Sequence, residues 1–418
     1  MGYVVIIGGG ASGMMAAVAA ASAGAKVTIV EHKDRVGKKL LSTGNGKCNF
    51  TNASQSADCY HSDNKGFAWK IVCRFDEKAV CDFFRELGVY PKERNGCYYP
   101  HSAQASSVLD VLRMELERLH VTILTGQECR GILSRKGKFH IELNDRELIC
   151  DKVILAAGSK AAAVTGSDGS GYILAKKLGH HLIPVLPALV QLKCAESFYK
   201  SISGVRINAK VSLFTEETLL ASDQGEVQLT AYGISGIPTF QVSRYAAKAL
   251  YAGKKVTARL DFAPEMSFDE LLSFFIQRAQ TRPQKKAEEF LTGMFPKKLN
   301  DLWIRLCDIE RSKEAGSLTK RELVKLTAMI KEFSTHVTST NSFEQAQVCC
   351  GGIDTREVNP LTLESRLVPG MYFAGEILDV DGPCGGYNLQ WAWSSGHVAG
   401  REAANASYQS IKTRTGAQ

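Results

Sequence analysis

The chain has 418 residues, of which 44% are hydrophobic and 22% are charged, and its formal net charge is +8. These values are typical of a globular protein with a large core, and the length predicts two or three domains. No apolar run reaches the roughly 18 residues needed to cross a bilayer, and the N-terminus lacks the basic segment of a signal peptide. We therefore expect a cytoplasmic protein with no membrane partner.

The excess of basic residues does not predict a nucleic-acid partner. There are 51 Lys and Arg residues against 43 Asp and Glu, and much of the excess lies in short pieces such as Arg282–Lys286 and Lys297–Lys298. Nucleic-acid binding needs a basic face with interleaved aromatic residues, and the sequence has no such stripe. We interpret these pieces as solvated surface with some attraction for anionic ligands.

Twelve cysteines are present, but no CxxC pair and no Cys/His spacing typical of a metal site occurs among them. In a chain without an export signal, such cysteines are most simply reduced thiols, several of them in the core. We expect no metal. The sequence does not predict an oligomeric state.

The first 31 residues predict a dinucleotide-binding unit. Tyr3–Ile7 is a β-branched apolar run typical of a buried strand, and residues 8–13 (GGGASG) fit the pattern G-x-G-x-x-G. A helix of small residues then reaches Ala23, and a second strand, Lys26–Val30, ends at Glu31. In such units the glycines and the helix start bind a pyrophosphate, and the acid accepts ribose hydroxyls. The predicted contacts are Gly8, Gly10, Ala11, Ser12, Gly13 and Glu31.

The polar, glycine-rich stretch after Glu31 predicts further contacts with the same cofactor. Arg35, Lys38 and Lys39 are placed to meet phosphate oxygens, and residues 42–46 (STGNG) offer backbone and amide groups to a flat ring. The alternative is a surface loop with incidental charge. The candidates here are His32, Arg35, Lys38, Lys39, Ser42, Thr43, Gly44, Asn45, Gly46, Cys48 and Asn49.

The next part of the chain predicts two helices, a loop and a small sheet. Helical periodicity covers Phe67–Leu87 and Ser106–Leu119, whereas Tyr98–Ser102 is predicted to be a loop. Three alternating runs predict a β-meander, and they cover Cys129–Leu133, Phe139–Leu143 and Glu147–Cys150. The buried strand Lys152–Ala156 then ends in the sequence AAG, residues 156–158.

The composition changes near Pro184, which predicts an inserted domain over residues 186–345. Its first part, 186–265, is predicted to be mainly β and its second, 266–335, mainly helical, with 336–345 as the return. After the insert, residues 371–376 (MYFAGE) predict a strand that runs into a turn. Gly385–Gln390 predicts a glycine-rich helix entry, and the helix Leu389–Ala404 has the small residues needed for close packing on a sheet.

These elements together resemble the two-dinucleotide-binding-domain flavoproteins. Such proteins combine an N-terminal fingerprint with a meander, an A-x-G strand end and a C-terminal strand that ends in Gly and an acid. Residues 156–158 match the A-x-G element, and residues 374–376 match the last one, with Glu376 in place of the more frequent Asp. The resemblance implies an α/β, Rossmann-type domain made of residues 1–185 and 346–418, with FAD as the cofactor.

Several longer motifs are similar to one narrower flavoprotein family, which contains aminoacetone-oxidase-like FAD enzymes and a clostridial bile-acid reductase. The motifs are GGGASG, RVGKKLLSTGNGKCNFTN, GSDGSGY, TAYGISGIP and AGEILDVDGPCGGYNLQWAWSSG, and the similarity spans residues 1–405. The family implies an inserted domain with a β-barrel-like and a helical part. It places the isoalloxazine ring between residues 42–49 and 375–390. Further implied cofactor contacts are Cys129, Ala156, Ala157, Gly158, Gly375, Glu376, Asp379, Gly386, Tyr387, Asn388, Leu389 and Gln390.

The resemblance implies an FAD-dependent oxidoreductase that reduces C=C bonds conjugated to the 3-keto group of bile-acid (steroid) intermediates. Reduced flavin would supply the hydride, and the helix that begins near Asn388 would stabilise negative charge on the ring. Such a reaction needs a proton donor, for which the catalytic candidates are Tyr387, Cys384 and Asp379. Asp381 and, from the insert, Tyr232 are further candidates.

Two alternative functions stay open at this point. One is an amine oxidase of the aminoacetone type that passes electrons to O2, and the other is a redox-sensing or partner-binding flavoprotein. The steroid reductase and the amine oxidase would use the same cofactor site. Because the sequence has no second nicotinamide fingerprint, electrons would come from transiently docked NAD(P)H, from another redox protein or from the substrate itself.

Overall fold

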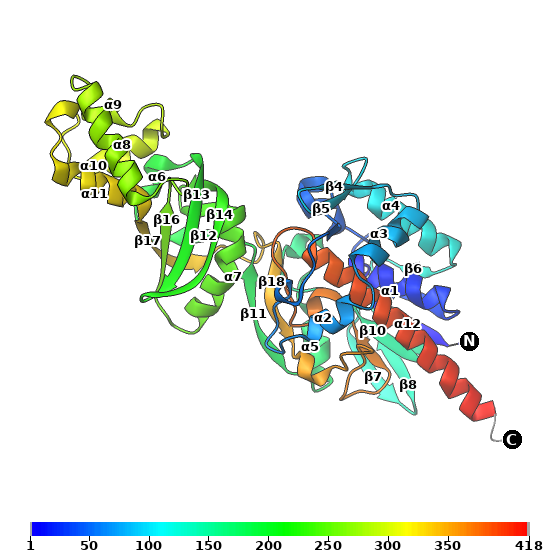
Figure 1. The fold of residues 1–418 in the computed structure, drawn as a ribbon. Helices are drawn as coiled ribbons and strands as arrows, with labels where there is room; N and C mark the ends of the chain where they lie inside the picture. The colour runs from blue at the N-terminus through cyan, green and yellow to red at the C-terminus, as the bar shows by residue number, and fades with distance from the viewer. Residues whose placement is uncertain (1, 416–418) are drawn as a thin grey trace. The chain divides into compact units, whose positions relative to one another are not determined.

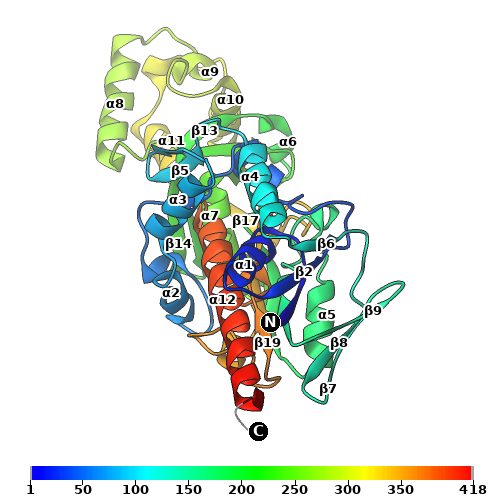
Figure 2. The same ribbon diagram turned by 90° about the vertical axis from the view of Figure 1, so that its right-hand side faces the viewer.

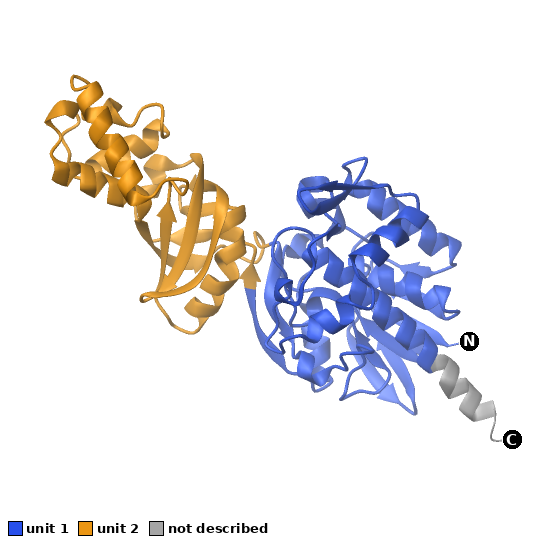
Figure 3. Cartoon of the chain, in the orientation of Figure 1, with its two compact units in different colours: residues 1–186, 347–418 blue, residues 187–346 orange. Residues whose placement is uncertain are grey.

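The computed structural model describes residues 2–415, with side chains to residue 406. The chain forms two compact units, unit 1 (residues 1–186 and 347–418) and unit 2 (residues 187–346), as Figure 3 shows. The chain leaves unit 1 within β11 (Leu182–Ala188) and returns just before β18 (Val348–Ile353), and these two strands pair with each other.

Unit 1 is built on a five-stranded parallel sheet with the strand order β19-β10-β1-β2-β6. Ile7 lies opposite Leu155 on one side and Val30 on the other, so the carboxyl ends of neighbouring strands meet at one edge. This order and direction confirm the predicted α/β, Rossmann-type fold. In that order the strands span Met371–Phe373, Lys152–Leu155, Tyr3–Ile7, Lys26–Val30 and Thr122–Leu124.

Two helices from opposite ends of the chain lie side by side in unit 1, α1 (Ala11–Ser22) and α12 (Tyr387–Thr415), as Figure 2 shows. Glycines make this contact possible. A Cβ atom on Gly396 would overlap the carbonyl oxygen of Ser12, and one on Gly400 would overlap that of Ala16. The two backbones therefore touch directly. The last helix was predicted to pack closely on the sheet, whereas its glycines make their close contacts with another helix, α1.

The remaining elements of unit 1 surround this sheet, and two predictions for them were wrong. Residues 67–87 form two helices instead of one, because Asp76 accepts a hydrogen bond from the Ala79 amide and starts a new helix. Residues 98–100 belong to β5, which pairs with β3 and β4, and do not form a loop. The elements are β3 (Thr51–Asn52), α2 (Phe67–Val72), α3 (Glu77–Glu86), β4 (Pro91–Arg94), β5 (Cys97–Pro100), α4 (Ala105–Arg118) and α5 (Ser170–Lys177). The predicted meander is present as β7 (Gly131–Arg135), β8 (Lys138–Glu142) and β9 (Glu147–Cys150).

Unit 2 contains a closed six-stranded barrel with the order β12-β15-β14-β13-β16-β17. A group of helices lies in the chain between the barrel strands β16 and β17 (Figure 1). The barrel was predicted, but the 15-residue helix α7 (Ile237–Tyr251), which packs on it, was not. The strands are β12 (Leu192–Cys194), β13 (Arg206–Thr215), β14 (Thr218–Thr230), β15 (Gly233–Gly236), β16 (Val256–Asp261) and β17 (Phe333–Thr340). The helices besides α7 are α6 (Tyr199–Ile202), α8 (Phe268–Thr281), α9 (Ala287–Phe290), α10 (Lys297–Leu306) and α11 (Lys320–Lys331).

Candidate functional site

The glycine-rich turn between β1 and α1 forms the centre of the candidate site. Gly8 has a φ of +107°, and a Cβ on it would lie 2.5 Å from the carbonyl oxygen of Ala156; a Cβ on Gly13 would overlap the carbonyl oxygen of Gly8. Gly10 differs, because nothing in the protein lies within 4 Å of the Cβ it lacks. No side chain caps the N-terminus of α1, and its first turn has no acidic residue. The turn therefore presents an open face and free N–H groups, which fits a pyrophosphate.

Glu31 is held rigidly at the end of β2, beside the glycine-rich turn. It is nearly buried, and its two carboxylate oxygens accept hydrogen bonds from the backbone N–H groups of Gly9 (2.8 Å) and Lys33 (2.9 Å). Two polar atoms nearby, His32 Nε2 and Gln127 Oε1, are buried without a hydrogen-bond partner among the described residues. The backbone N–H group of Gln127 donates a hydrogen bond to the Glu31 carbonyl oxygen. Orphaned polar atoms beside a fixed carboxylate fit the adenosine part of a dinucleotide.

The basic residues after Glu31 have partners of their own in this structure. Lys39 forms an ion pair of 2.7 Å with Glu376, which also accepts a hydrogen bond from Ser159. Lys38 pairs with Asp34, and Arg35 is exposed. Lys39 and Glu376, which the sequence assigned separately to the cofactor, thus lie together.

The loop at residues 42–49 is folded by left-handed backbone conformations. Gly44, Asn45, Gly46 and Cys48 all have φ between +55° and +80°, while the Ser42 and Thr43 hydroxyl groups donate hydrogen bonds back to the carbonyl groups of Lys39 and Leu40. The loop meets the C-terminal segment at Gly386, because a Cβ there would lie 2.6 Å from the Thr51 carbonyl oxygen and 2.8 Å from Asn49 Oδ1. Asn49 Oδ1 is itself buried and has no hydrogen-bond partner within the part of the chain that the structure describes. The two segments that the sequence assigned to a flavin ring are therefore adjacent.

The segment from Gly375 to Gln390 is held in place by its own contacts. A Cβ on Gly375 would overlap the Ser12 hydroxyl group, which brings this segment onto the glycine-rich turn. The Asn388 side chain accepts a hydrogen bond from the backbone N–H group of Gly382 and donates one to its carbonyl oxygen. Gln390 is fully buried, and its amide group donates to the Phe75 carbonyl oxygen and to Ser394. The Gln390 side chain therefore supports α12, whereas Leu389 is half-buried.

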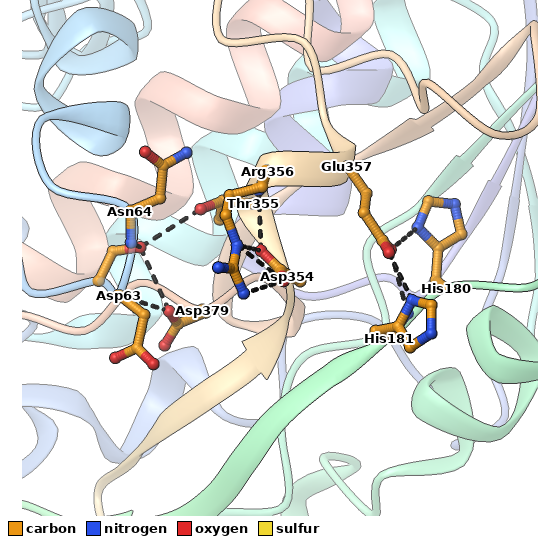
Figure 4. Close-up of polar contacts among 10 residues, drawn as sticks. Asp63, Asn64, His180, His181, Asp354, Thr355, Arg356, Glu357 and Asp379 are labelled. Carbon is orange, nitrogen blue, oxygen red and sulfur yellow. Dashed lines mark hydrogen bonds and ion pairs between the residues drawn. The ribbon is translucent and has the colours of Figure 1, made fainter.

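The three catalytic candidates have different surroundings. The Tyr387 hydroxyl group donates to the Ser54 carbonyl oxygen at 3.0 Å, and burial, with Cys59 close by, raises the pKa of Tyr387 to about 12. Asp379 is buried, and its carboxylate accepts hydrogen bonds from the Asp63 amide and the Ser62 hydroxyl group (Figure 4). Cys384 is half-buried in the loop before α12. Tyr387 alone of the three carries a phenol that stays protonated at neutral pH.

The two other candidates are Asp381 and Tyr232. Asp381 is buried, and His61 lies 3.8 Å from its carboxylate while the two backbones form a bridge. Asp379 and Asp381 together hold residues 61–63 against the C-terminal segment. Tyr232 lies in unit 2, between β14 and β15, and is 39% exposed.

All twelve cysteines, which lie within the described residues, are free thiols. Burial raises the pKa of Cys48 to about 12 despite a hydrogen bond from Thr43, and it raises that of Cys129 to the same value. Such thiols are uncharged at neutral pH and are poor nucleophiles. Cys349 and Cys350 are buried neighbours in β18. No group of side chains in the described part of the chain is arranged to hold a metal ion.

Sequence reasoning missed Ser159 and Gln127. Ser159 directly follows the AAG strand end, so its position next to a known motif was an available signal. Gln127 had none, because a long-range backbone hydrogen bond to the Glu31 carbonyl oxygen positions it, and no local pattern encodes that contact.

Beside Asp379, a second polar network fixes the segment that follows β18. Glu357 accepts hydrogen bonds from the rings of His180 (3.1 Å) and His181 (2.6 Å), and Figure 4 shows it between them. Burial alone would raise the pKa of Glu357, but the hydrogen bonds from His181 and the charges of both histidines outweigh it and lower the pKa. His180 is completely buried, and its other ring nitrogen lies 2.8 Å from the Ser365 hydroxyl group.

Comparison with known proteins relates this fold to one family. The model of the family described as "HI0933-like protein Rossmann domain" matches residues 2–402. The 3-dehydro-bile acid delta(4,6)-reductase of Clostridium scindens is 48% identical over 91% of this chain and 93% of its own length. The ribosomal RNA dihydrouridine synthases of Haemophilus influenzae and Escherichia coli are 28% and 27% identical, over 94% of this chain and at least 95% of their own lengths. Within the described residues, none of the helices is both long and apolar enough to span a membrane.

The lowered pKa of Glu357 predicts a specific acid sensitivity. A carboxyl group whose pKa is lower in the folded state stabilises the fold above its unfolded pKa, near 4.3, and loses this contribution as the pH falls through its folded value. Urea unfolding between pH 6 and pH 3 is expected to show a steeper loss of stability below about pH 4.5 in the wild type than in Glu357→Gln. The control Glu128→Gln, at an exposed position, should follow the wild type. Parallel curves for wild type and Glu357→Gln would contradict the assignment.

Proposed function

We propose, from the premise that the chain belongs to the HI0933-like family, that it is an FAD-dependent reductase of C=C bonds conjugated to a carbonyl group. Its proposed substrates are 3-oxo bile-acid (steroid) intermediates. The observation that carries the proposal is 48% identity, over nine-tenths of both chains, to a protein named for this reaction.

The reactions for which the relatives are named share one chemical feature. A 3-dehydro-bile acid with Δ4,6 double bonds carries C=C bonds conjugated to its 3-keto group, and uridine carries a C=C bond conjugated to a ring carbonyl. Saturating either bond requires a hydride at the β-carbon, a proton at the α-carbon and a donor to the carbonyl oxygen. The same catalytic groups could therefore carry out both reactions, and the substrate pocket would select between the steroid and uridine.

The residues around the glycine-rich turn fit FAD. Gly10 and the start of α1 would hold the pyrophosphate, Glu31 the adenosine ribose, and residues 42–49 together with Gly386 the ring. When bound and reduced, FAD supplies a hydride. The proposed electron donor is NAD(P)H. The free thiols suit a reducing cytoplasm, which is the proposed location.

We assign the donor role to Tyr387. Its phenol is protonated at neutral pH, as an ordinary tyrosine is, and would donate to a substrate carbonyl oxygen in place of the Ser54 carbonyl oxygen that accepts its hydrogen bond in this structure. It lies at the first turn of α12, whose positive end also favours negative charge that develops on that oxygen. Asp379, in this proposal, is a positioning residue, since its carboxylate holds the loop at residues 62–63.

A second candidate substrate is uridine in ribosomal RNA. It is favoured by the two relatives of that name, which match this chain almost from end to end. Their identity to this chain is well below that of the bile-acid reductase, so the steroid is preferred.

The function is tested by anaerobic mixing. FAD-loaded protein, reduced with dithionite, is expected to be reoxidised rapidly by a 3-oxo-Δ4,6 bile acid, with saturated product detected by mass spectrometry. Reoxidation by a ribosomal RNA fragment, but not by the steroid, would move the function to the second candidate. If aminoacetone reduces the oxidised flavin and air then yields peroxide, the protein is an amine oxidase and the proposal fails.

Replacing Tyr387 tests the donor. Tyr387→Phe removes only the hydroxyl group and is expected to lower the turnover number about 100-fold while leaving KM and flavin binding unchanged. Tyr60→Phe is the matched control, because Tyr60 packs edge-on against Tyr387 at 6.3 Å and bonds Gln55 instead. An equal loss in both variants would indicate a packing role for Tyr387.

Gly10→Ala separates cofactor binding from folding. The new methyl group meets no protein atom, so the stability of the apoprotein should change by no more than about 1 kcal/mol. The dissociation constant for FAD, measured by fluorescence titration, should rise at least about tenfold, which equals about 1.4 kcal/mol. Gly13→Ala should instead destabilise the apoprotein itself by about 1–3 kcal/mol. Unchanged FAD affinity in Gly10→Ala would place the pyrophosphate elsewhere.

A further inference from the structure

A basic groove with an exposed aromatic ring lies over the C-terminal half of α8, in unit 2. Figure 1 labels this helix. It has a volume of about 350 Å³ and is lined by Phe274, Gln277, Arg278, Thr281, Arg282 and Lys285. These positions recur every three or four residues, so they form one stripe along the helix and the turn that follows it. None of the six is acidic, and three carry positive charge.

The groove is rigid because its far end is tied down by backbone hydrogen bonds. The amides of Ala315 and Gly316 donate to the carbonyl groups of Lys285 (2.7 Å) and Pro283 (2.9 Å). A Cβ on Gly316 would lie 2.6 Å from Pro283, so the two segments are in close contact. Arg282 and Lys285 therefore project from a fixed turn.

The three cations have different roles. Arg278 is part of the fold, since its guanidinium group donates to the carbonyl oxygens of Phe290 and Thr292. Arg282 and Lys285, in contrast, form no ion pair with any residue that the structure describes. Among the acids closest in sequence, Glu270 is used in the capping box at the start of α8, and Glu288 is paired with Arg311. Two cations are thus left for an external anion.

Phe274 supplies the second element that a ligand would need. Its ring is 36% exposed, and the Arg278 guanidinium group lies 6.0 Å from its centroid. A flat, exposed ring beside cations is the arrangement on which nucleic-acid bases stack while phosphates pair with the charges. An anionic small molecule or an acidic peptide would use the cations but not the ring.

We propose that this groove binds a single-stranded polynucleotide, with phosphates at Arg282 and Lys285 and a base stacked on Phe274. RNA and DNA share this chemistry. The inference goes beyond the steroid reductase function proposed above, and RNA binding would also serve the second candidate substrate, uridine in ribosomal RNA. It differs from the interpretation of Arg282–Lys286 as solvated surface, because it adds Phe274, which lines the same groove.

The test uses the FAD-loaded full chain and fluorescein-labelled 12-mers of oligouridylate and oligothymidylate, with fluorescence anisotropy measured over a range of salt concentrations. The double variant Arg282→Gln/Lys285→Gln is expected to weaken binding and to reduce the slope of log K against log salt by about 1.4, the value for two phosphate contacts on a single strand. Phe274→Ala should weaken binding about tenfold with the slope unchanged. The control Lys254→Gln/Lys255→Gln removes the same charge from exposed positions in unit 2.

Three outcomes would overturn the proposal. The first is no binding of either oligomer by the wild type. The second is an equal loss in the control double variant, which would indicate general charge attraction. The third is full retention of affinity in Phe274→Ala, which would leave an anion site without base stacking. Thermal unfolding of each variant shows whether it is folded, and a preference for oligouridylate over oligothymidylate would identify RNA as the ligand.

Discussion

The direct contact between the backbones of α1 and α12 is the constraint on which the candidate site depends. Gly396 and Gly400 let the last helix lie against the carbonyl groups of Ser12 and Ala16. Through this contact, Gly375 meets Ser12 and the loop before α12 meets residues 49–51. A larger residue at either glycine would push the helices apart and would separate the two halves of the site.

The site combines a rigid frame with a few groups left for chemistry. The side chains of Glu31, Asp379 and Gln390 form hydrogen bonds with backbone groups of the protein and so stabilise the fold. Burial keeps the thiol of Cys48 neutral. What remains is the open face at Gly10. The phenol of Tyr387 donates to the Ser54 carbonyl oxygen in this structure and would exchange that acceptor for a substrate oxygen. Such an arrangement suits a reaction in which hydride comes from a cofactor and the protein supplies orientation and a donor.

The sequence predicted the parts of the fold that local patterns specify. The fingerprint, the parallel strands and the meander follow from period-two or period-3.6 patterns and from glycine spacing, whereas the barrel was implied by the resemblance to a flavoprotein family. The break at Asp76 was missed because a capping residue inside a continuous apolar pattern decides it. Helix α7 was missed because it lies within a run of strands. The pairing of Lys39 with Glu376 joins residues 337 positions apart, and no local pattern encodes such a contact.

The contact between α1 and α12 also determines when the site can form during synthesis. The glycine-rich turn is translated before unit 2, whereas Gly386, Gly396 and Gly400 follow only after the whole barrel and its helices. Until those late residues leave the ribosome, one face of α1 has no cover, and the nascent chain exposes the small apolar side chains that α12 later buries. Unit 2 has its own core and can fold as it emerges. During that time α1 has not yet packed against α12.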